Sequence, residues 1–462
     1  MQFKRNSLLF LICLLFSFQK STAVLTDQLS DNCWKAGVSR AVITPEESLW
    51  MAGYASRDHA SEGVLHDLWT KVLAIEDARG NKAVLITNDL LEIPKQYSDR
   101  IRDRLEKEYG LQRSQVILNC SHTHTGPVLY DALANWYPID AIQTRKIIAY
   151  TEKIENTIVE LTGKALNSMV PSHIYAGNGI ARFQVNRRNN QEALSNQITD
   201  LNGPNDYAVP VMKIVAGTGE LLAVTFGYAC HPTVLSFYQY SGDYPGFAQI
   251  EIEKLYPGTT AMFFQGAGAD QNPLPRRTVP LAHQYGRTLA AAVDRVLNEE
   301  MRKLEPALVT AYSEIDLQFA GPPPTRQDLL NQISDTSKTP DYLKLTAKTL
   351  IGRLDRGEIF DTVYPYPCQV WKLGNQAIMA LGGELVTEYS LELKKLFGPD
   401  IFVLGYTNDV MAYIPSETIL KEGGYEGTRS TFFTTPWKMN IQSVIISEMV
   451  KLAQKTGVSQ VK

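Results

Sequence analysis

Residues 82–127, KAVLITNDLLEIPKQYSDRIRDRLEKEYGLQRSQVILNCSHTHTGP, contain the pattern that decides the fold of this 462-residue chain. The apolar run at 82–93 predicts a β-strand, and the run that ends near residue 120 predicts another. Between them, residues 94–110 predict a helix, with Pro94 in its first turn and Gly110 as its stop. Apolar side chains at helical spacing give this helix one buried face: Tyr97, Ile101, Leu105 and Tyr109.

The same order of strand, helix and strand occurs twice more along the chain. A crossover through a helix favours parallel neighbouring strands, with the helices covering the sheet. We therefore expect an α/β fold of mixed, largely parallel β-sheets covered by helices and built from repeated β-α-β units. The further units lie at 221–232, 245–258 and 260–273, and at 375–385, 386–399 and 401–415.

Polar side chains follow the predicted strands at the points where they end. In sheets of this kind, ligands gather beyond the carboxyl ends of the strands. Groups that bind metals or transfer protons are therefore expected at one edge of the sheet. The residues at these positions are His122, His124, His231, Asp270, Glu384 and Tyr413.

Three of these residues have the side chains that zinc prefers. A catalytic zinc site usually takes three protein ligands and leaves one position for water, and His122, His231 and Glu384 meet that requirement. Each also has a simpler interpretation, as a hydrogen-bonded core histidine or as a carboxylate at a helix N-terminus. Cys120 or Cys230 is an alternative soft ligand, although an exported thiol is prone to oxidation.

His122 and His124 are one residue apart, so they share a face if the strand continues through them. Adjacent residues on one face rarely chelate a single ion easily. We therefore expect one histidine to bind the metal and the other to transfer protons or orient a ligand.

Composition and the N-terminal segment limit the classes of function. The net charge of −4 argues against nucleic acid as a partner, because phosphate binding needs a concentrated basic surface. Residues 1–23 combine two positive charges, an apolar core and a small-residue STA ending, which predicts a cleaved signal peptide and a secreted or periplasmic protein. The cysteines that remain allow zero, one or two disulfides: Cys33, Cys120, Cys230 and Cys368.

The most polar stretch is 321–360, which opens with GPPPT and continues with apolar residues at helical spacing. This pattern predicts a helical insertion. It is a candidate lid over the site, and a decorated surface loop is the alternative.

An ordered set of motifs resembles the neutral, non-lysosomal ceramidase family over approximately residues 35–455. Single motifs such as CHPT are weak, whereas the ordered set is specific to the superfamily. The motifs are MAGYASRD, GVLHDLWTKVLAIED, SHTHTGP, VNRR, CHPTVLS, GDYPGFA, GGE, YIPSE and GGYEG.

The resemblance implies a single zinc ion held by two histidines, a glutamate and a tyrosine, matched here by His122, His231, Glu384 and Tyr413. The assignment of Tyr413 comes from the resemblance alone, since a tyrosine is an uncommon zinc ligand. His124, Arg187 and Tyr425 match positions that contact or polarise the substrate amide, with Arg187 preferred to Arg188. Asp270 matches a retained aspartate, and His66 matches a position that helps to line the site.

Two departures from the family pattern affect the expected chemistry and length. GADQNP places Asn272 where the family has a serine, and an amide side chain cannot act as that nucleophile. The match also implies that residues 24–462 form a catalytic domain without the immunoglobulin-like C-terminal domain of typical members.

We therefore expect a secreted, zinc-dependent hydrolase that cleaves an amide bond of an N-acyl substrate resembling ceramide, with a zinc-activated water as the nucleophile. Asn272 would then bind substrate at the mouth of the site. The expected partner is a small-molecule or lipid acyl substrate, with peripheral membrane contact allowed and the oligomeric state open. The alternatives are a zinc esterase or deacetylase acting on an acylated glycan or other small molecule, and an inactive binding homologue.

Overall fold

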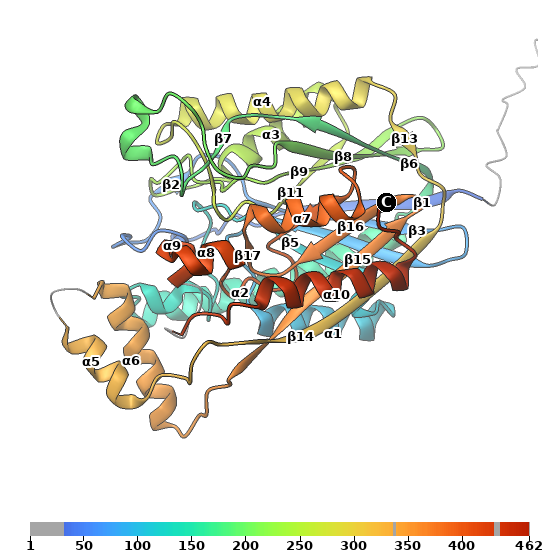
Figure 1. The fold of residues 1–462 in the computed structure, drawn as a ribbon. Coiled ribbons are helices and arrows are strands. Elements are labelled where there is room, and N and C mark those ends of the chain that lie inside the picture. Colours follow the sequence, from blue (N-terminus) through green and yellow to red (C-terminus); the bar gives the residue numbers. More distant parts are fainter. Residues whose placement is uncertain (1–31, 336–338, 429–434, 462) are drawn as a thin grey trace, which may run out of the picture.

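The computed structural model describes residues 32–335, 339–428 and 435–461 (Figure 1). The predicted signal peptide at 1–23 lies outside these residues. Within them, no helix has the length and apolar character needed to span a bilayer. The cysteines of the described ranges form no disulfide, so the following thiols are free: Cys33, Cys120, Cys230 and Cys368.

In the described part of the chain, the larger sheet has nine strands. Eight of them follow one another in the order β11, β9, β8, β6, β1, β3, β4 and β5, and β13 pairs with β6. The strands are β1 (Trp34–Val42), β3 (Trp69–Glu76), β4 (Lys82–Asn88), β5 (Val116–Cys120), β6 (Val170–Ile180), β8 (Ala208–Ala216), β9 (Leu221–Tyr228), β11 (Thr260–Gln265) and β13 (Arg302–Lys303).

A second sheet has the order β14, β15, β16 and β18. Its strands are β14 (Leu308–Gln318), β15 (Val363–Leu373), β16 (Gln376–Leu381) and β18 (Phe402–Leu404). Three short two-stranded pairs lie outside both sheets: β10 (Gln239–Tyr240) with β2 (Gly63–Val64), β12 (Gln271–Pro273) with β7 (Gln184–Asn186), and β17 (Glu384–Leu385) with β19 (Tyr413–Ile414).

The expectation of largely parallel sheets is wrong. Within the two larger sheets, the parallel pairs are β4 with β5, β9 with β11, and β16 with β18, and each pair encloses one helix. The remaining pairs are antiparallel. Short hairpins join β3 to β4, β8 to β9 and β15 to β16, as at Asp77–Asn81 between β3 and β4. A hairpin fixes the antiparallel direction, whereas a parallel neighbour needs a longer crossover.

Helices cover the outer faces of the sheets (Figure 1). α1 and α2 pack over β3, β4 and β5, α3 and α4 cover β8, β9 and β11, and α7 and α10 cover the second sheet. These helices are α1 (Lys95–Tyr109), α2 (Ala141–Asn167), α3 (Asp243–Leu255), α4 (Val279–Asn298), α7 (Thr387–Phe397) and α10 (Ile441–Thr456). α1 ends at Gly110, whose φ of 70° lies in the left-handed region that glycine adopts readily.

The inner faces of both sheets share a single apolar core. In β4, Val84 and Ile86 contact the helices, while Ala83 and Leu85 face the opposite way, because strand side chains alternate. Side chains of the second sheet complete this inner core against those of the larger sheet: Trp371, Ile378, Phe402 and Leu404. The strands therefore need apolar residues on both faces, which explains their continuous apolar runs.

The carboxyl ends of three parallel strands meet at the buried side chain of Asn119. Its Nδ2 donates to the carbonyl of Gly405 at 2.8 Å and to the hydroxyl of Thr407 at 3.1 Å. Its Oδ1 accepts from the backbone N–H of Gln265 at 2.9 Å. One side chain thus joins β5 to β11 and to the segment after β18.

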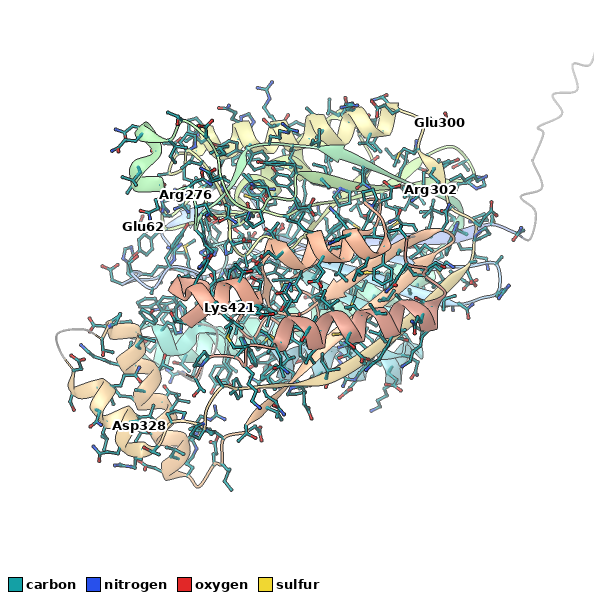
Figure 2. The ribbon with its side chains drawn as sticks, viewed as in Figure 1. Glu62, Arg276, Glu300, Arg302, Asp328 and Lys421 are labelled. Carbon is teal, nitrogen blue, oxygen red and sulfur yellow. The ribbon has the colours of Figure 1, made fainter. Side chains whose placement is uncertain are left out.

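The segment 321–360 contains α5 (Arg326–Ser334) and α6 (Asp341–Asp355), which lie between β14 and β15 in the chain. The side chain of Thr325 caps α5, and Asp328 completes the capping box from its exposed position (Figure 2). Tyr342 on α6 contacts Trp136, with ring centroids 4.8 Å apart. α6 thereby lies against η2, which spans Leu133–Trp136, and α5 packs on α6.

Replacing Asn119 with alanine should lower the free energy of unfolding by about 3 kcal/mol or more, since it leaves several buried polar groups without partners, each costing about 1–3 kcal/mol. Urea unfolding measures this change. The matched control is Asn156→Ala on the exposed face of α2, expected within about 0.5 kcal/mol of the native chain. Equal effects of the two substitutions would contradict the junction described above.

Candidate metal centre

The backbone turns out of the strand direction at His122. Its φ of 64° lies in the left-handed region, so the alternation of a continuing strand does not apply here. The hydroxyls of Thr123 and Thr125 each donate to the carbonyl of Ser241 at 2.8 Å and hold the turn. The rings of His122 and His124 face each other with centroids 5.0 Å apart, because of this turn rather than a shared strand face.

Residues of the MAGYASRD motif hold His124 in place. Gly53 has a φ of 102°, and a Cβ there would lie 2.5 Å from Nδ1 of His124, so only glycine allows the ring to pack so closely. Arg57 donates through Nη2 to the carbonyl of His124 at 2.8 Å. The ring of Tyr54 lies 4.9 Å from that of His124.

The Gly-Gly-Glu sequence sets the position of Glu384. Gly383 has a φ of 69°, and a Cβ there would lie 2.5 Å from Cγ1 of Ile414. The parallel pair β17–β19 then places Glu384 directly beside Tyr413. This register explains how two residues 29 positions apart in the sequence reach the same site.

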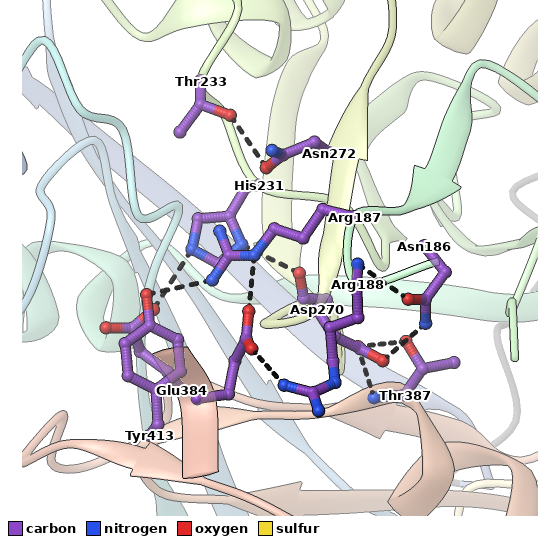
Figure 3. A network of polar contacts seen from close by, with 12 residues as sticks. Asn186, Arg187, Arg188, His231, Thr233, Asp270, Asn272, Glu384, Thr387 and Tyr413 are labelled. Atoms are coloured by element: carbon purple, nitrogen blue, oxygen red, sulfur yellow. Dashed lines mark hydrogen bonds and ion pairs between the residues drawn. The ribbon is translucent and has the colours of Figure 1, made fainter. Parts of the chain in front are cut away.

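The Nε2 atoms of two histidine rings approach one carboxylate oxygen of Glu384, and Figure 3 shows the contact made by His231. Nε2 of His122 and Nε2 of His231 lie 3.2 and 3.1 Å from Oε2 of Glu384. Two ligands of one tetrahedral zinc ion lie about 3.3 Å apart, given zinc–nitrogen distances of about 2.0–2.1 Å. The Nδ1 atoms face the carbonyls of Leu91 and Gly268, each at 2.8 Å, as in metal-binding histidines with a fixed tautomer.

The three histidines His122, His124 and His231 could hold a metal ion, because one ring nitrogen from each lies within 4.8 Å of the others. Among the described residues, both ring nitrogens of His124 are buried without a hydrogen-bond partner, and Nε2 of His122 has only the carboxylate of Glu384 beside it. Buried polar atoms without partners are rare in folded proteins, so this donor set fits a metal ion. His124 differs from the other two because no carbonyl orients its ring.

Arg187 lies between a carboxylate and Tyr413 (Figure 3). It donates through Nε to Glu426 at 2.8 Å and through Nη2 to the hydroxyl of Tyr413 at 3.2 Å. Its guanidinium lies 5.7 Å from the ring centres of both Tyr413 and Tyr425. Arg188 instead pairs with Glu426 and Glu422, at the outer side of this group.

The site keeps His124 and His231 neutral and Glu384 ionised at neutral pH. Burial, followed by the charge of Arg187, lowers the pKa of His231 to about 4. Burial and the two neighbouring histidines hold the pKa of His124 well below its usual range. Burial alone would raise the pKa of Glu384, but His122 and His231 hold it well below its ordinary value. These are the protonation states that bind a metal cation.

Two residues predicted for the site, Asp270 and Asn272, are absent from the cavity lining and make their contacts on the side away from it. The carboxylate of the buried Asp270 accepts from the backbone N–H and hydroxyl of Thr387, at 2.9 and 2.8 Å, and from Nδ2 of Asn186 at 2.9 Å. It therefore joins β12 to α7 and β7. Oδ1 of Asn272 accepts from the hydroxyl of Thr233 at 3.3 Å, just beyond His231 (Figure 3).

His66 packs on α3 rather than among the other predicted residues. Its ring lies 4.9 Å from that of Phe247, and a Cβ at Gly246 would lie 2.3 Å from its Cε1. Burial lowers the pKa of His66. It is absent from the described residues that line the cavity beside the histidines.

A cavity of about 330 Å³ opens beside the histidines. Its polar wall includes His122, His124, Glu384, Tyr413 and Tyr425. Its apolar wall includes Leu91, Leu133, Trp136, Leu343 and Met411. Because Tyr342 and Leu343 belong to α6, the segment 321–360 forms part of this wall.

Sequence reasoning missed three buried residues of the site. Glu92 lines the cavity, and burial together with the charge of Glu384 raises its pKa well above the usual range. Tyr406 lies with its ring 4.4 Å from that of His122, and its hydroxyl is buried without a hydrogen-bond partner. Glu426 pairs with Arg187. In the structure β4 ends at Asn88, whereas the predicted strand continues to residue 93. Glu92 therefore lies inside the predicted strand, and the rule that located the histidines does not select it.

Comparison with known families places this site in context. The family model "Neutral/alkaline non-lysosomal ceramidase, N-terminal" matches residues 34–296. The neutral ceramidase of Pseudomonas aeruginosa is 24% identical over 257 residues, which are 52% of this chain and 37% of that protein. Neutral ceramidase B of Dictyostelium discoideum is 26% identical over 245 residues, 49% of this chain and 33% of that protein. The match therefore spans about a third of the length of these relatives.

Two solved structures share the fold at low sequence identity. The structure titled "Ceramidase complexed with C2" superposes with a TM-score of 0.70 at 17% identity, covering 93% of this chain and 76% of that one. A crystal structure of neutral ceramidase from Pseudomonas aeruginosa gives a TM-score of 0.68 at 19% identity with the same coverage. The mixed α/β architecture is therefore that of neutral ceramidase.

Zinc should stabilise the native chain and should not stabilise a Glu384→Ala variant. A ligand at about 1,000 times its Kd raises the free energy of unfolding by about 4 kcal/mol if it binds only the folded state. Melting temperature with zinc and with a chelator measures this difference. His283→Ala, at a partly exposed histidine on α4, should respond like the native chain. Equal zinc stabilisation of Glu384→Ala would place the metal elsewhere.

His231 should contribute stability to the metal-free chain that is lost as the pH falls from about 6.5 to about 4. The folded-state pKa of His231 is about 4, below the ordinary value of about 6.5, so the unfolded chain binds more protons in this window. The lowered pKa of Glu384 acts in the same direction. Urea unfolding across this range should show a shallower pH slope for His231→Gln, and an unchanged slope would contradict the assignment.

Proposed function

The chain belongs to the neutral/alkaline non-lysosomal ceramidase family, and from this premise we propose that it is a zinc-dependent hydrolase that cleaves the amide bond of an N-acyl lipid resembling ceramide. The observation that carries the proposal is the pair of oriented histidines converging on Glu384 beside the partnerless ring of His124. An apolar wall next to this group suits an acyl chain.

His122, His231 and Glu384 would hold the zinc ion, with Tyr413 as the fourth protein ligand that the family resemblance implies. When bound, zinc acts as a Lewis acid and lowers the pKa of a bound water to about 7. The carbonyls of Leu91 and Gly268 keep Nε2 of both histidines available. Glu384 contributes a negative charge that compensates part of the charge of the cation.

His124 would transfer the proton during hydrolysis. Its ring is neutral and has no hydrogen-bond partner on either nitrogen, so it can accept a proton from the attacking water. The same nitrogen then returns that proton to the leaving amine nitrogen as the carbon–nitrogen bond breaks. The fatty acid and the free amine leave, and His124 is neutral again.

Arg187 and Tyr425 would stabilise the negative charge that develops on the carbonyl oxygen. Glu426 and Tyr413 fix the orientation of the Arg187 guanidinium, so little reorganisation is needed in the transition state. Asp270 supports this arrangement through the backbone, because its carbonyl accepts from the N–H of Arg187 at 2.8 Å.

Direct attack by water agrees with the side chain at position 272. Asn272 replaces the family serine and has no hydroxyl to deprotonate. Its side-chain oxygen instead accepts from the hydroxyl of Thr233, just beyond His231. Export from the cytoplasm is part of the proposal, and the signal-peptide pattern of residues 1–23 supports it.

His124→Gln should lower kcat by about 10²- to 10⁴-fold while the protein still gains stability from zinc. Glu384→Ala should lose both turnover and zinc stabilisation. Hydrolysis of N-acyl lipids with short and long chains, measured beside acylated sugars and model esters, identifies the substrate class. His283→Ala is the matched control and should retain activity.

Three outcomes would overturn parts of the proposal. Loss of zinc stabilisation in His124→Gln would make His124 a metal ligand instead of the proton carrier. Turnover of esters or acylated sugars alone would favour the esterase or deacetylase alternative. Zinc binding without hydrolysis of any tested substrate would favour the alternative of an inactive binding homologue.

A further inference from the structure

Glu92 is a buried acid in the cavity wall that the proposed reaction does not use. Glu92 lies in the segment after β4 and is 7% exposed. It lines the same cavity as His122, His124 and Glu384. Among the described residues, nothing forms a hydrogen bond or ion pair with its carboxyl group, and Oε1 is fully enclosed.

Other buried acids of this chain have partners within the protein. Asp89 accepts from the backbone N–H of Trp69 at 3.0 Å, and Asp243 accepts from that of Leu235 at 2.8 Å. Tyr364 donates to Asp409 at 2.7 Å. A buried polar group without a partner costs about 1–3 kcal/mol, so the exceptional state of Glu92 needs an explanation.

The surroundings of Glu92 exclude an internal ion pair. The charged groups that act on Glu92 are Glu384 and Asp409, both acidic, and no cation of the described residues is among them. The nearby cavity wall is apolar at Leu91, Leu133 and Met411. A ligand that fills the cavity and excludes water from it would therefore have to supply a hydrogen bond to this carboxyl group.

We propose that Glu92 is a specificity-determining residue that binds a hydroxyl group of the N-acyl substrate, close to the amide that is cleaved. A hydroxyl both donates and accepts, so it satisfies the carboxyl group whichever oxygen carries a proton. An ammonium group would lose its hydration beside apolar side chains. The inference rests on the proposed function and assigns one residue of the cavity wall to the recognition of a substrate hydroxyl.

This arrangement rejects amides that lack the hydroxyl. Such a ligand would occupy the cavity and leave the carboxyl group of Glu92 unpaired and without access to water. Sites that hydrogen-bond a substrate hydroxyl discriminate in this way, because the unpaired buried group is left in the complex.

Binding of two sulfonamide probes to the zinc-loaded protein tests the inference without turnover. One probe is an N-(2-hydroxyethyl) alkylsulfonamide, and the other carries an ethyl group in its place; neither has a carbonyl to hydrolyse. Calorimetry should show that the native chain binds the hydroxyl probe about 10-fold more tightly, equivalent to about 1.4 kcal/mol.

Two variants at position 92 separate hydrogen bonding from shape. Glu92→Gln keeps a hydrogen-bonding side chain and should retain most of the preference. Glu92→Leu should bind the two probes within about 2-fold of each other. It should also raise the melting temperature of the ligand-free protein, since it removes the unpaired group. Met411→Leu changes the same cavity wall without changing hydrogen bonding, so it should keep the native ratio.

The inference is overturned by a native ratio near one, by a preference that survives in Glu92→Leu, or by the absence of binding by both probes. Hydrolysis of an N-acyl ethanolamine and its N-ethyl amide is measured in parallel. Hydroxyl-selective binding without turnover would refute the proposed function and support the hydroxyl-binding role of Glu92. Turnover of both amides with equal kcat/KM would refute the role of Glu92 and support the proposed function.

Discussion

The site depends on the hydrogen bonds of one buried amide, the side chain of Asn119. It joins the end of β5 to β11 and to the segment after β18, at the edge where the three β-α-β units meet. An asparagine can do this because it carries donors and an acceptor on one short, rigid side chain. His122 lies three residues beyond Asn119 and Tyr406 one residue beyond Gly405, so the junction positions both chain segments.

Backbone strain is concentrated in the segments that the Asn119 junction holds. His122, Tyr406 and Asn408 all have positive φ angles, of 64°, 51° and 65°. Such conformations cost about 1–3 kcal/mol each and persist where surrounding contacts determine them. Here the N–H of Asn408 donates to the carbonyl of Leu118 at 2.7 Å, and its side chain accepts from the N–H of Leu118 at 3.0 Å. The strain turns the His122 ring away from the strand face and toward Glu384.

The sequence predicts the three crossover units and the convergence of their strand ends well, because both follow from local apolar patterns and the geometry of parallel strands. The sequence does not predict the antiparallel direction of the other strands. Hairpins such as Asp77–Asn81 leave only a weak sequence pattern between strands that are apolar throughout. Within the site, histidines stand out as rare residues. Glu92 and Glu426 do not, because their distinction lies in burial and in partners from distant segments.

Charge balance explains why Arg187 can lie so close to a metal site. A divalent cation would repel a guanidinium in a buried setting, where charges are weakly screened. Glu426 is 2% exposed and pairs with Arg187, so it neutralises that charge before any ion binds. Glu384 then remains available to compensate the metal. Arg187 keeps its direction toward the hydroxyl of Tyr413, so the proposed reaction would combine a metal cation with a fixed hydrogen-bond donor around one carbonyl.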